Sequence, residues 1–518
     1  MQYISTRDQK HKFSFEDILL KGLADDGGLF VPESIPELDE NLITELLSKD
    51  YQNITFEIVK FFAGDTFEAS KLSQMIEESY CNFRDRRVTP LKIIDDRISI
   101  LELHHGPTLA FKDLAMQLLS RMIEHVLDRN KKRASIICAT SGDTGGAAVS
   151  AFANKNNIDL YVLFPKNRIS EVQRRFMTTN SASNVHVISI DGTFDDCQNI
   201  VKALFKDKKL SNSVQLTAVN SINWARIMIQ VMYYFSAYSQ LDDKSGKINF
   251  IVPTGNFGDI FAGYIAKKMG LSINQLVIAT NKNNILEKCF KSGDYEISGV
   301  IPTISPSMDI QISSNFERLL FDLVGRKSKI VCEKMADLAN HNRFKLDNEQ
   351  LTQFRASFGA GSLDDSETLE IIKKVYLEYN EIIDPHTAVA MGIQFKNKYE
   401  QSVILSTAHP AKFPDTVDKA IGKYPQLPIA NVNIYKQEER IISKNNKLNE
   451  IKEYIEHVLR EKKQIVDFLT KKISEEVDEI EQEEYMEIIT EYYDDDEILR
   501  EIIEMEIHEI QKKNKMDD

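Results

Sequence analysis

The chain has 518 residues, too many for one compact core, so we expect two or three domains. A hydrophobic content of 42% beside 28% charged residues is typical of a soluble globular protein, and no apolar run is long enough to span a bilayer, which argues against any membrane role. The net charge of −15 arises almost wholly from residues 475–511, where 17 acidic residues and one arginine give −16, and such a tail would repel nucleic-acid phosphates.

Cysteine usage points to a reducing compartment. The five cysteines are scattered without close pairs, which fits neither a disulfide framework nor a zinc site. The N-terminal MQYISTRDQK has no apolar stretch of the kind found in secretion signals, so we expect a cytoplasmic protein. His104 and His105 do not make a metal pair, because adjacent strand residues point to opposite faces, and we predict no metal site.

The predicted elements begin with a mixed, mostly helical module over residues 1–92. From residue 93 to 437 we expect a catalytic core of two α/β subdomains, because short apolar runs rich in β-branched residues alternate with helical stretches from Ala134 onward. The fold class is therefore α/β with parallel sheets. The predicted strands are 134–140, 159–164, 185–190, 214–219, 249–253, 275–280 and 402–407.

Three loops follow predicted strands. They are TSGDTGG (140–146), PTGNFGD (253–259) and STAHPAKF (406–413), and the first two also open predicted helices. Ligands of parallel sheets bind beyond the carboxyl ends of the strands, near helix N-termini. We therefore expect all three loops on the same edge of the sheet.

Residues 438–518 differ in character from the rest. They contain no proline or glycine, and Ile, Leu, Glu and Lys dominate, which predicts a helical, acidic C-terminal extension. A solvated helix or a partly disordered appendage is the simpler interpretation. The alternative is a docking surface for an unknown basic partner.

Lys112, in HGPTLAFKD (105–113), stands ahead of the two glycine-containing loops. A lysine on an apolar helix face loses its charge readily, which favours the neutral amine that imine chemistry requires. Together these segments resemble the threonine synthase family, whose members are fold-type-II enzymes dependent on pyridoxal 5′-phosphate. The resemblance extends to YISTR (3–7), GLFVP (28–32) and NSIN (220–223), as well as to STAHPAKF.

The resemblance implies that Lys112 forms the imine with the cofactor and moves protons on substrate carbons, beside Phe111. Gly255 and Gly258, with Asn256 and Phe257 between them, would cradle the cofactor phosphate, since glycines let backbone N–H groups approach it and the next helix adds a favourable dipole. We expect Asp259, an acid beside this phosphate, to act as an N-cap facing its own helix.

The resemblance places Asp143 beside the ring hydroxyl of the cofactor and gives Ser141 and Thr144 to the carboxylate of an amino acid. The alternative is a simple strand-to-helix turn that Asp143 caps. Ser406 and Thr407 would face the pyridine nitrogen, where a hydroxyl in place of a carboxylate leaves the nitrogen neutral. A weaker electron sink suits chemistry at Cβ and Cγ.

NSINWAR (220–226) is the predicted substrate discriminator. Asn220, Ser221 and Arg226 could hold a second, distal phosphate, with bidentate contacts from Arg226. The alternative is an ordinary N-cap at Asn223 and a surface arginine. Two residues of PKNRIS, Lys166 and Arg168, are weaker candidates for the distal phosphate.

The family implies an enzyme that converts O-phospho-L-homoserine and water to L-threonine and phosphate. This β,γ-replacement, by a carbon–oxygen lyase acting on phosphates, is the last step of threonine biosynthesis. Two alternatives stay open. One is another fold-type-II lyase, such as a dehydratase or phospholyase, and the other is a catalytically silent binding relative.

Overall fold

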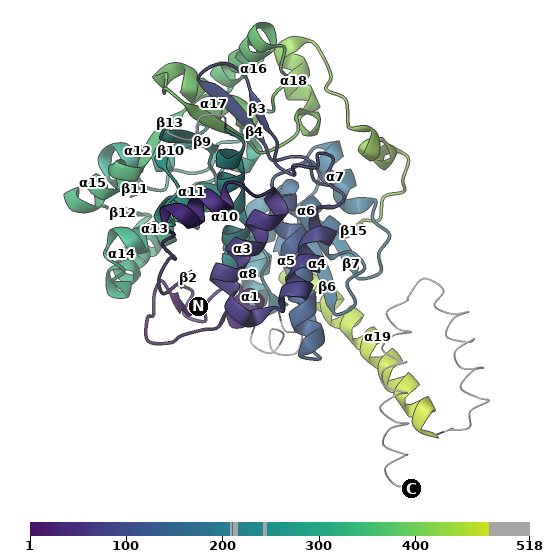
Figure 1. Cartoon of the computed structure of the whole chain (residues 1–518). Helices are drawn as coiled ribbons and strands as arrows, with labels where there is room; N and C mark the ends of the chain where they lie inside the picture. The colour runs from purple at the N-terminus through teal and green to yellow at the C-terminus, as the bar shows by residue number, and fades with distance from the viewer. Residues whose placement is uncertain (208–209, 211–215, 242–245, 476–518) are drawn as a thin grey trace.

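The computed structural model describes residues 1–207, 210, 216–241 and 246–475. It confirms the α/β class: two largely parallel sheets are each flanked by helices (Figure 1). Within the described residues, no helix combines the length and the apolar composition that crossing a membrane requires.

The larger sheet has six strands in the order β13-β10-β9-β14-β4-β3. All neighbours are parallel except β3 and β4. Strand β9 is buried along its whole length, as its apolar sequence INFIVP predicts for a central parallel strand. The strands are β3 (Leu91–Ile93), β4 (Ile98–Glu102), β9 (Ile248–Pro253), β10 (Ile273–Thr280), β13 (Phe358–Ser362) and β14 (Ser402–Ser406).

The second sheet has five parallel strands in the order β15-β7-β6-β5-β8. They are β5 (Ala134–Ala139), β6 (Ile158–Pro165), β7 (Val185–Asp191), β8 (Leu216–Thr217) and β15 (Ile442–Asn445). All seven predicted strands are found in the two sheets, although the predicted run 214–219 reaches into residues that the structure leaves undescribed. Of the predicted run 214–219, only Leu216 and Thr217 form the strand β8.

Helices cover both faces of the sheets. The helix α10 (Trp224–Ser239) is buried on every side and packs against α3, α5 and α11. The other helices after residue 92 are α5 (Lys112–Arg129), α6 (Asp143–Phe152), α7 (Glu171–Thr178), α8 (Phe194–Lys206), α11 (Gly258–Lys268), α12 (Ile285–Ser292), α13 (Phe316–Leu323), α14 (Ser328–His341), α15 (Asn348–Ser357), α16 (Asp365–Tyr379), α17 (Pro385–Asn397), α18 (Pro414–Ile421) and α19 (Leu448–Glu475), with short 3-10 turns at η2 (Pro306–Met308), η3 (Pro410–Lys412) and η4 (Ile429–Tyr435). A two-stranded sheet joins β11 (Asp294–Glu296) and β12 (Arg343–Lys345).

The N-terminal residues form helices around one short antiparallel pair of strands. The elements are β1 (Tyr3–Ser5), α1 (Phe15–Lys21), β2 (Phe30–Pro32), α2 (Glu40–Leu46), α3 (Tyr51–Ala63), η1 (Gly64–Thr66) and α4 (Ala69–Tyr80). A capping box between Ser14 and Asp17 fixes the start of α1. Figure 1 shows these purple elements against the middle of the molecule, where they share one hydrophobic core with α5 and α10.

The region after residue 437 is not only helical. β15 extends the five-stranded sheet beside β7, which the polar sequence ISKN did not predict. The first turns of α19 bury Ile451, Ile455 and Val458 against that sheet and α8, and the helix then extends away from the body (Figure 1). Nearly all of the acidic run 475–511 lies outside the described residues.

Candidate active site

The three predicted loops converge, but from two sheets. TSGDTGG follows β5 of the five-stranded sheet, whereas PTGNFGD and STAHPAKF follow β9 and β14 of the six-stranded sheet. The expectation of one shared sheet edge was therefore wrong. The loops meet because the carboxyl ends of the two sheets face the same region, at the N-terminal end of α5.

Lys112 is the first residue of α5, and its side chain is only 13% exposed. Its Nζ lies 3.4 Å from Oδ2 of Asp143 and 5.4 Å from the ring centre of Phe111. The backbone N–H of Phe111 in turn donates to the carbonyl of Thr407 at 2.9 Å, which ties this lysine to the end of β14. Burial lowers the pKa of Lys112. The carboxylate of Asp143 acts to raise this pKa, and the positive charges of Lys412 and Arg226 act to lower it further.

Asp143 does not cap its helix, since Gly142 is the N-cap of α6. Its buried carboxylate accepts from the side-chain amide of Gln173 at 2.9 Å and from the hydroxyl of Ser307 at 3.2 Å. Lys412 adds an ion pair at 2.7 Å. Burial acts to raise the pKa of Asp143, but the ammonium groups of Lys412 and Lys112 outweigh it and hold this pKa well below its usual range.

The PTGNFGD loop forms an open cradle of backbone donors. Among the described residues, the N–H groups of residues 255–258 have no hydrogen-bond partner. A Cβ at Gly255 would lie 2.6 Å from the carbonyl oxygen of Ser307, so only glycine fits there. Phe257 adopts a left-handed conformation and caps α11, so these N–H groups lie at the positive end of that helix dipole. Such a set of donors fits a phosphate.

Asp259 is not the N-cap that the sequence suggested, because Phe257 occupies that position. The buried Asp259 carboxylate accepts from the N–H of Ile260 at 2.8 Å, and so it does bond to its own helix. Burial raises the pKa of Asp259 to about 7. The carboxyl group is therefore largely neutral in mildly acidic solution, which reduces the repulsion expected of an acid beside a phosphate.

The TSGDTGG loop directs a second set of donors outward. The hydroxyl of Thr140 accepts from the N–H groups of Gly142 and Gly145, each at 2.9 Å, and this holds the turn. Gly142 has φ +127°, and a Cβ there would lie 2.5 Å from Gln173. Among the described residues, the hydroxyls of Ser141 and Thr144 are left without partners, and they fit a carboxylate.

The hydroxyls at the end of β14 differ in their surroundings. The Ser406 hydroxyl lies 3.1 Å from that of Thr387, which also donates to the buried carboxylate of Asp384. The Thr407 hydroxyl has no partner within the described part of the chain. A carboxylate is therefore near this strand end, but it is already hydrogen-bonded by other groups.

His386 was not predicted from the sequence, and it connects Asp384 with the loop over the cradle. Its Nε2 accepts from the backbone N–H of Ser307 at 3.2 Å, while its Nδ1 lies 2.8 Å from Oδ1 of Asp384. Because a backbone N–H can only donate, the ring proton lies on Nδ1 and donates to Asp384. This pair fixes Ser307, whose hydroxyl reaches Asp143.

Arg226 is a buried residue, 2% exposed, and not the surface arginine of the alternative interpretation. Asn223 does cap α10, as that alternative required. Within the described ranges, the guanidinium of Arg226 makes one hydrogen bond, from Nη1 to the carbonyl of Val219 at 3.3 Å, and its Nε has none. No carboxylate of the described residues pairs with it. Burial lowers the pKa of Arg226 to about 10, so the guanidinium is still charged at neutral pH, and a buried charge without a counterion favours the binding of an anion.

Asn220 is exposed and Ser221 half-buried at the start of the same turn, while the weaker candidates Lys166 and Arg168 are both exposed. A residue that the sequence did not reveal holds this turn. The side-chain amide of Asn315 donates to the carbonyls of Ser221 and Asn256, each at 3.0 Å. One amide therefore connects the NSIN turn with the glycine cradle.

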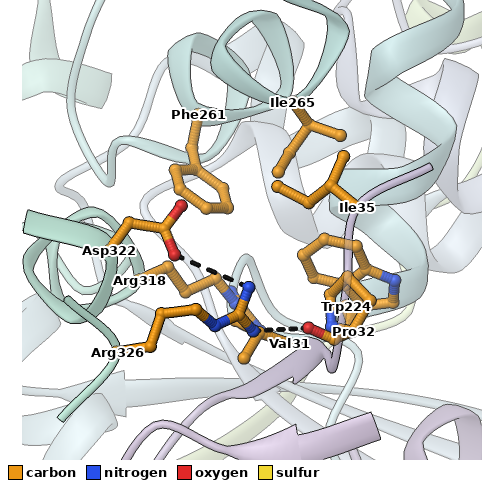
Figure 2. Close-up of a pocket in the computed structure, with 9 residues that line it drawn as sticks. All are labelled: Val31, Pro32, Ile35, Trp224, Phe261, Ile265, Arg318, Asp322 and Arg326. Carbon is orange, nitrogen blue, oxygen red and sulfur yellow. Dashed lines mark hydrogen bonds and ion pairs between the residues drawn. The ribbon is translucent and has the colours of Figure 1, made fainter. Parts of the chain in front are cut away.

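Arg318 extends this hydrogen-bond network toward the N-terminal residues. It donates to the side chain of Asn315, to the carbonyl of Ile222 at 2.6 Å and to the carbonyl of Phe30 at 2.9 Å. Figure 2 shows Arg318 in a small pocket beside Val31 and Pro32 of β2. The pocket is lined by Val31, Pro32, Ile35, Trp224, Phe261, Ile265, Arg318, Asp322 and Arg326.

The N-terminal motifs YISTR and GLFVP pack on α13, the helix that carries Arg318. Glu317 accepts from the hydroxyl of Thr6 at 2.7 Å and pairs with Arg7 at 2.8 Å. YISTR and GLFVP therefore contribute no group to the three loops. Their contacts with Glu317 and Arg318 anchor the start of α13, from which Asn315 reaches the site.

The sequence suggested that the side chains of His104 and His105 point to opposite faces, and this expectation was wrong. The rings stack, with centres 5.2 Å apart, because neither residue belongs to a strand, and His409 packs edge-on against His104 at 5.3 Å. Burial lowers the pKa of His409 to about 4. Over the described ranges, no group of three or more His, Cys, Asp or Glu side chains is arranged to hold a metal ion.

Comparison with known proteins matches three successive parts of the chain to family models. Residues 2–80 match the threonine synthase N terminus, residues 87–340 the pyridoxal-phosphate dependent enzymes, and residues 387–455 the threonine synthase C-terminal region. Threonine synthase of Pseudomonas aeruginosa is 44% identical over 88% of this chain and 98% of its own, and that of Schizosaccharomyces pombe is 41% identical over 82% and 90%.

Solved structures agree with this assignment. The crystal structure of PLP-bound threonine synthase from Brucella melitensis covers 88% of this chain and 99% of its own, with a TM-score of 0.85 and 46% identity. Yeast threonine synthase gives a TM-score of 0.84 at 38% identity, covering 89% and 99%. The chain is therefore a member of the threonine synthase family of pyridoxal-phosphate-dependent enzymes.

Proposed function

We propose that this chain converts O-phospho-L-homoserine and water to L-threonine and phosphate. The observation that carries the proposal is Arg226, a buried and charged guanidinium with no carboxylate partner among the described residues, close enough to Lys112 to influence its charge. A lyase whose substrates lack a distal anion would have no use for this cation. A substrate phosphate would neutralise it.

Pyridoxal phosphate fits the residues around Lys112. The free N–H groups of residues 255–258 would bind its phosphate, and Lys112 would hold its aldehyde carbon beside Phe111. Asp143 would lie at the ring hydroxyl, and Ser406 and Thr407 at the ring nitrogen. When bound, the cofactor supplies an electron sink that makes the substrate Cα and Cβ protons acidic.

The remaining groups would bind the two ends of the substrate. Ser141 and Thr144 would bind the carboxylate of the amino acid, and Asn220, Ser221 and Arg226 its phosphate. The Lys112 amine would take the proton from Cα and later one from Cβ. Phosphate would leave from Cγ, and a proton would return to Cγ. Water would then add at Cβ, and a proton would return to Cα, which completes the β,γ-replacement.

A hydroxyl at the ring nitrogen is consistent with this chemistry. Thr407 offers an uncharged partner, while the buried carboxylate of Asp384 is already bonded by Thr387 and His386. A neutral ring nitrogen holds electrons less strongly, so that charge can pass on toward Cγ and expel phosphate.

A substrate panel distinguishes this proposal from another fold-type-II lyase. Purified protein with pyridoxal phosphate should release phosphate from O-phospho-L-homoserine much faster than from O-phospho-L-serine, whose phosphate is one carbon closer. Deamination of serine or threonine without turnover of phosphohomoserine would select a dehydratase. A preparation that does not bind the cofactor at all would select the silent binding relative.

Two further parts of the proposal concern the whole chain. We place the protein in the cytoplasm, because all five cysteines are free thiols, a state that a reducing compartment maintains. We also keep the division at residue 92. Because β15 and the start of α19 pack into the five-stranded sheet, we place the beginning of the acidic extension after them and not at residue 437, and we propose the extension as a surface for a basic partner. Its net charge of −16 over residues 475–511 supports that choice.

A further inference from the structure

A second lysine is buried beside Lys112. Lys412 ends η3 in the STAHPAKF loop and is 1% exposed. Its Nζ lies 2.7 Å from Oδ1 of Asp143 and donates to the carbonyl of Thr108 at 2.8 Å. The Nζ of Lys112 lies 3.4 Å from the other oxygen, Oδ2, of the same carboxylate. Two amines therefore share one negative charge, and Lys412 makes the shorter contact.

Among the described residues, the other charged groups around Lys112 do not supply a second counterion below about pH 7. Arg226 on α10 is positive, and Asp259 on α11 is a buried acid whose pKa burial raises to about 7. Asp113, next to Lys112 on α5, accepts both hydrogen bonds of Thr108, at 2.6 and 2.8 Å, and burial raises its pKa. An ammonium group on Lys112 would thus face two nearby cations and only part of the charge of Asp143.

We propose that Lys412 is a positioning residue: by taking Asp143 as its own ion-pair partner, it leaves Lys112 as the uncharged amine that imine chemistry needs. The inference rests on the proposed role of Lys112, but it concerns the protein without cofactor or substrate. It assigns to the lysine of STAHPAKF a task that touches neither. If Lys412 were absent, Asp143 would have Lys112 as its ion-pair partner, and the attraction would keep that amine protonated to higher pH.

The test measures the protonation of Lys112 directly. Full-length protein stripped of cofactor is labelled with acetic anhydride at a series of pH values, and mass spectrometry follows the peptide that carries Lys112, with the exposed Lys10 as internal reference. In the wild type, the midpoint of Lys112 labelling should lie below that of Lys10. Lys412→Met should move this midpoint upward by one pH unit or more, and Lys412→Arg should leave it within about half a unit.

A double variant keeps the test valid if the single change disturbs the fold. Asp143→Asn with Lys412→Met removes both charges of the pair, so the midpoint of Lys112 should return to a low value. An unchanged or lowered midpoint in Lys412→Met, or a raised one in the double variant, would overturn the proposal. Because labelling needs no substrate, failure here is distinct from a failure to turn over phosphohomoserine.

Discussion

The side-chain amide of Asn315 donates to the backbone carbonyl of Ser221 at 3.0 Å, and the same nitrogen reaches the carbonyl of Asn256. One residue on neither loop therefore sets the spacing between the NSIN turn and the glycine cradle. If these hold the two phosphates, their spacing determines which substrate length the enzyme accepts.

Replacing Asn315 with alanine should weaken the binding of both phosphates. The change leaves the Ser221 carbonyl without this partner and removes an acceptor of Arg318, at about 1–3 kcal/mol for an unsatisfied buried group. We expect a lower thermal midpoint, a raised KM for phosphohomoserine and a raised Kd for pyridoxal phosphate. The exposed Asn348→Ala is the matched control. A change confined to one of the two ligands would contradict the coupling.

Arg226→Met should damage substrate handling selectively. Loss of a charge-assisted contact costs ~2–5 kcal/mol in kcat/KM, roughly a thirty- to several-thousand-fold decrease. Cofactor absorbance should stay normal, because the cradle of residues 255–258 is intact. Arg343→Met, at an exposed position in β12, should leave kinetics unchanged. Parallel loss of bound cofactor would instead place Arg226 in the cofactor site.

Asp259 predicts a pH dependence of stability. Its native pKa, raised by burial to about 7, lies above that of an unfolded aspartate near 3.9, so its stabilising contribution is present below about pH 4 and is lost as pH rises through 7. The slope reaches up to about 1.4 kcal/mol per pH unit. The free energy of unfolding of the cofactor-free protein, measured in urea between pH 5 and 8, should therefore fall more steeply with pH for the wild type than for Asp259→Asn. Identical slopes would show that Asp259 titrates normally.

Two truncations should distinguish the role of the acidic tail from that of the part of α19 that packs on the sheet. A chain ending at Gln464 keeps Ile451, Ile455 and Val458 and the contact of Lys462 with Asp159 at 2.5 Å, so we expect normal cofactor content and turnover. A chain ending at Asn446 loses the three buried aliphatic side chains, at ~1.5–3 kcal/mol each, and should unfold at lower temperature. Loss of turnover by the stable, longer chain would place the tail in the active site.

Much of the fold could be predicted because buried parallel strands have a local signature. The runs that became β5, β6, β7, β9, β10 and β14 are apolar and β-branched. The sequence ISILE of β4 has the same signature, but this strand was not predicted. Two other strands were missed because they lack the signature. β13 contains two glycines in FGAGS, and β15 is the polar ISKN, so both depend on a neighbouring strand for their conformation.

The candidate site divides in the same way. Lys112 and the glycine loops lie in contiguous motifs, and their roles could be predicted from a short stretch of chain. Asn315 and His386 could not be predicted, because each acts through backbone groups that only tertiary packing brings near. Lys412 lay within a recognised motif, and its place between Ala411 and Phe413 was a signal of burial. Its pairing with Asp143, 269 positions away in the chain, was not visible.

The most direct test of the account follows oxygen atoms through the reaction. O-phospho-L-homoserine is turned over in water enriched in oxygen-18, with Lys112→Ala as the inactive control. Elimination breaks the carbon–oxygen bond, so the account predicts unlabelled phosphate and L-threonine with one solvent oxygen in its hydroxyl group. Labelled phosphate with homoserine as product would mean hydrolysis at phosphorus, and turnover that survives in Lys112→Ala would equally contradict the central role of that lysine.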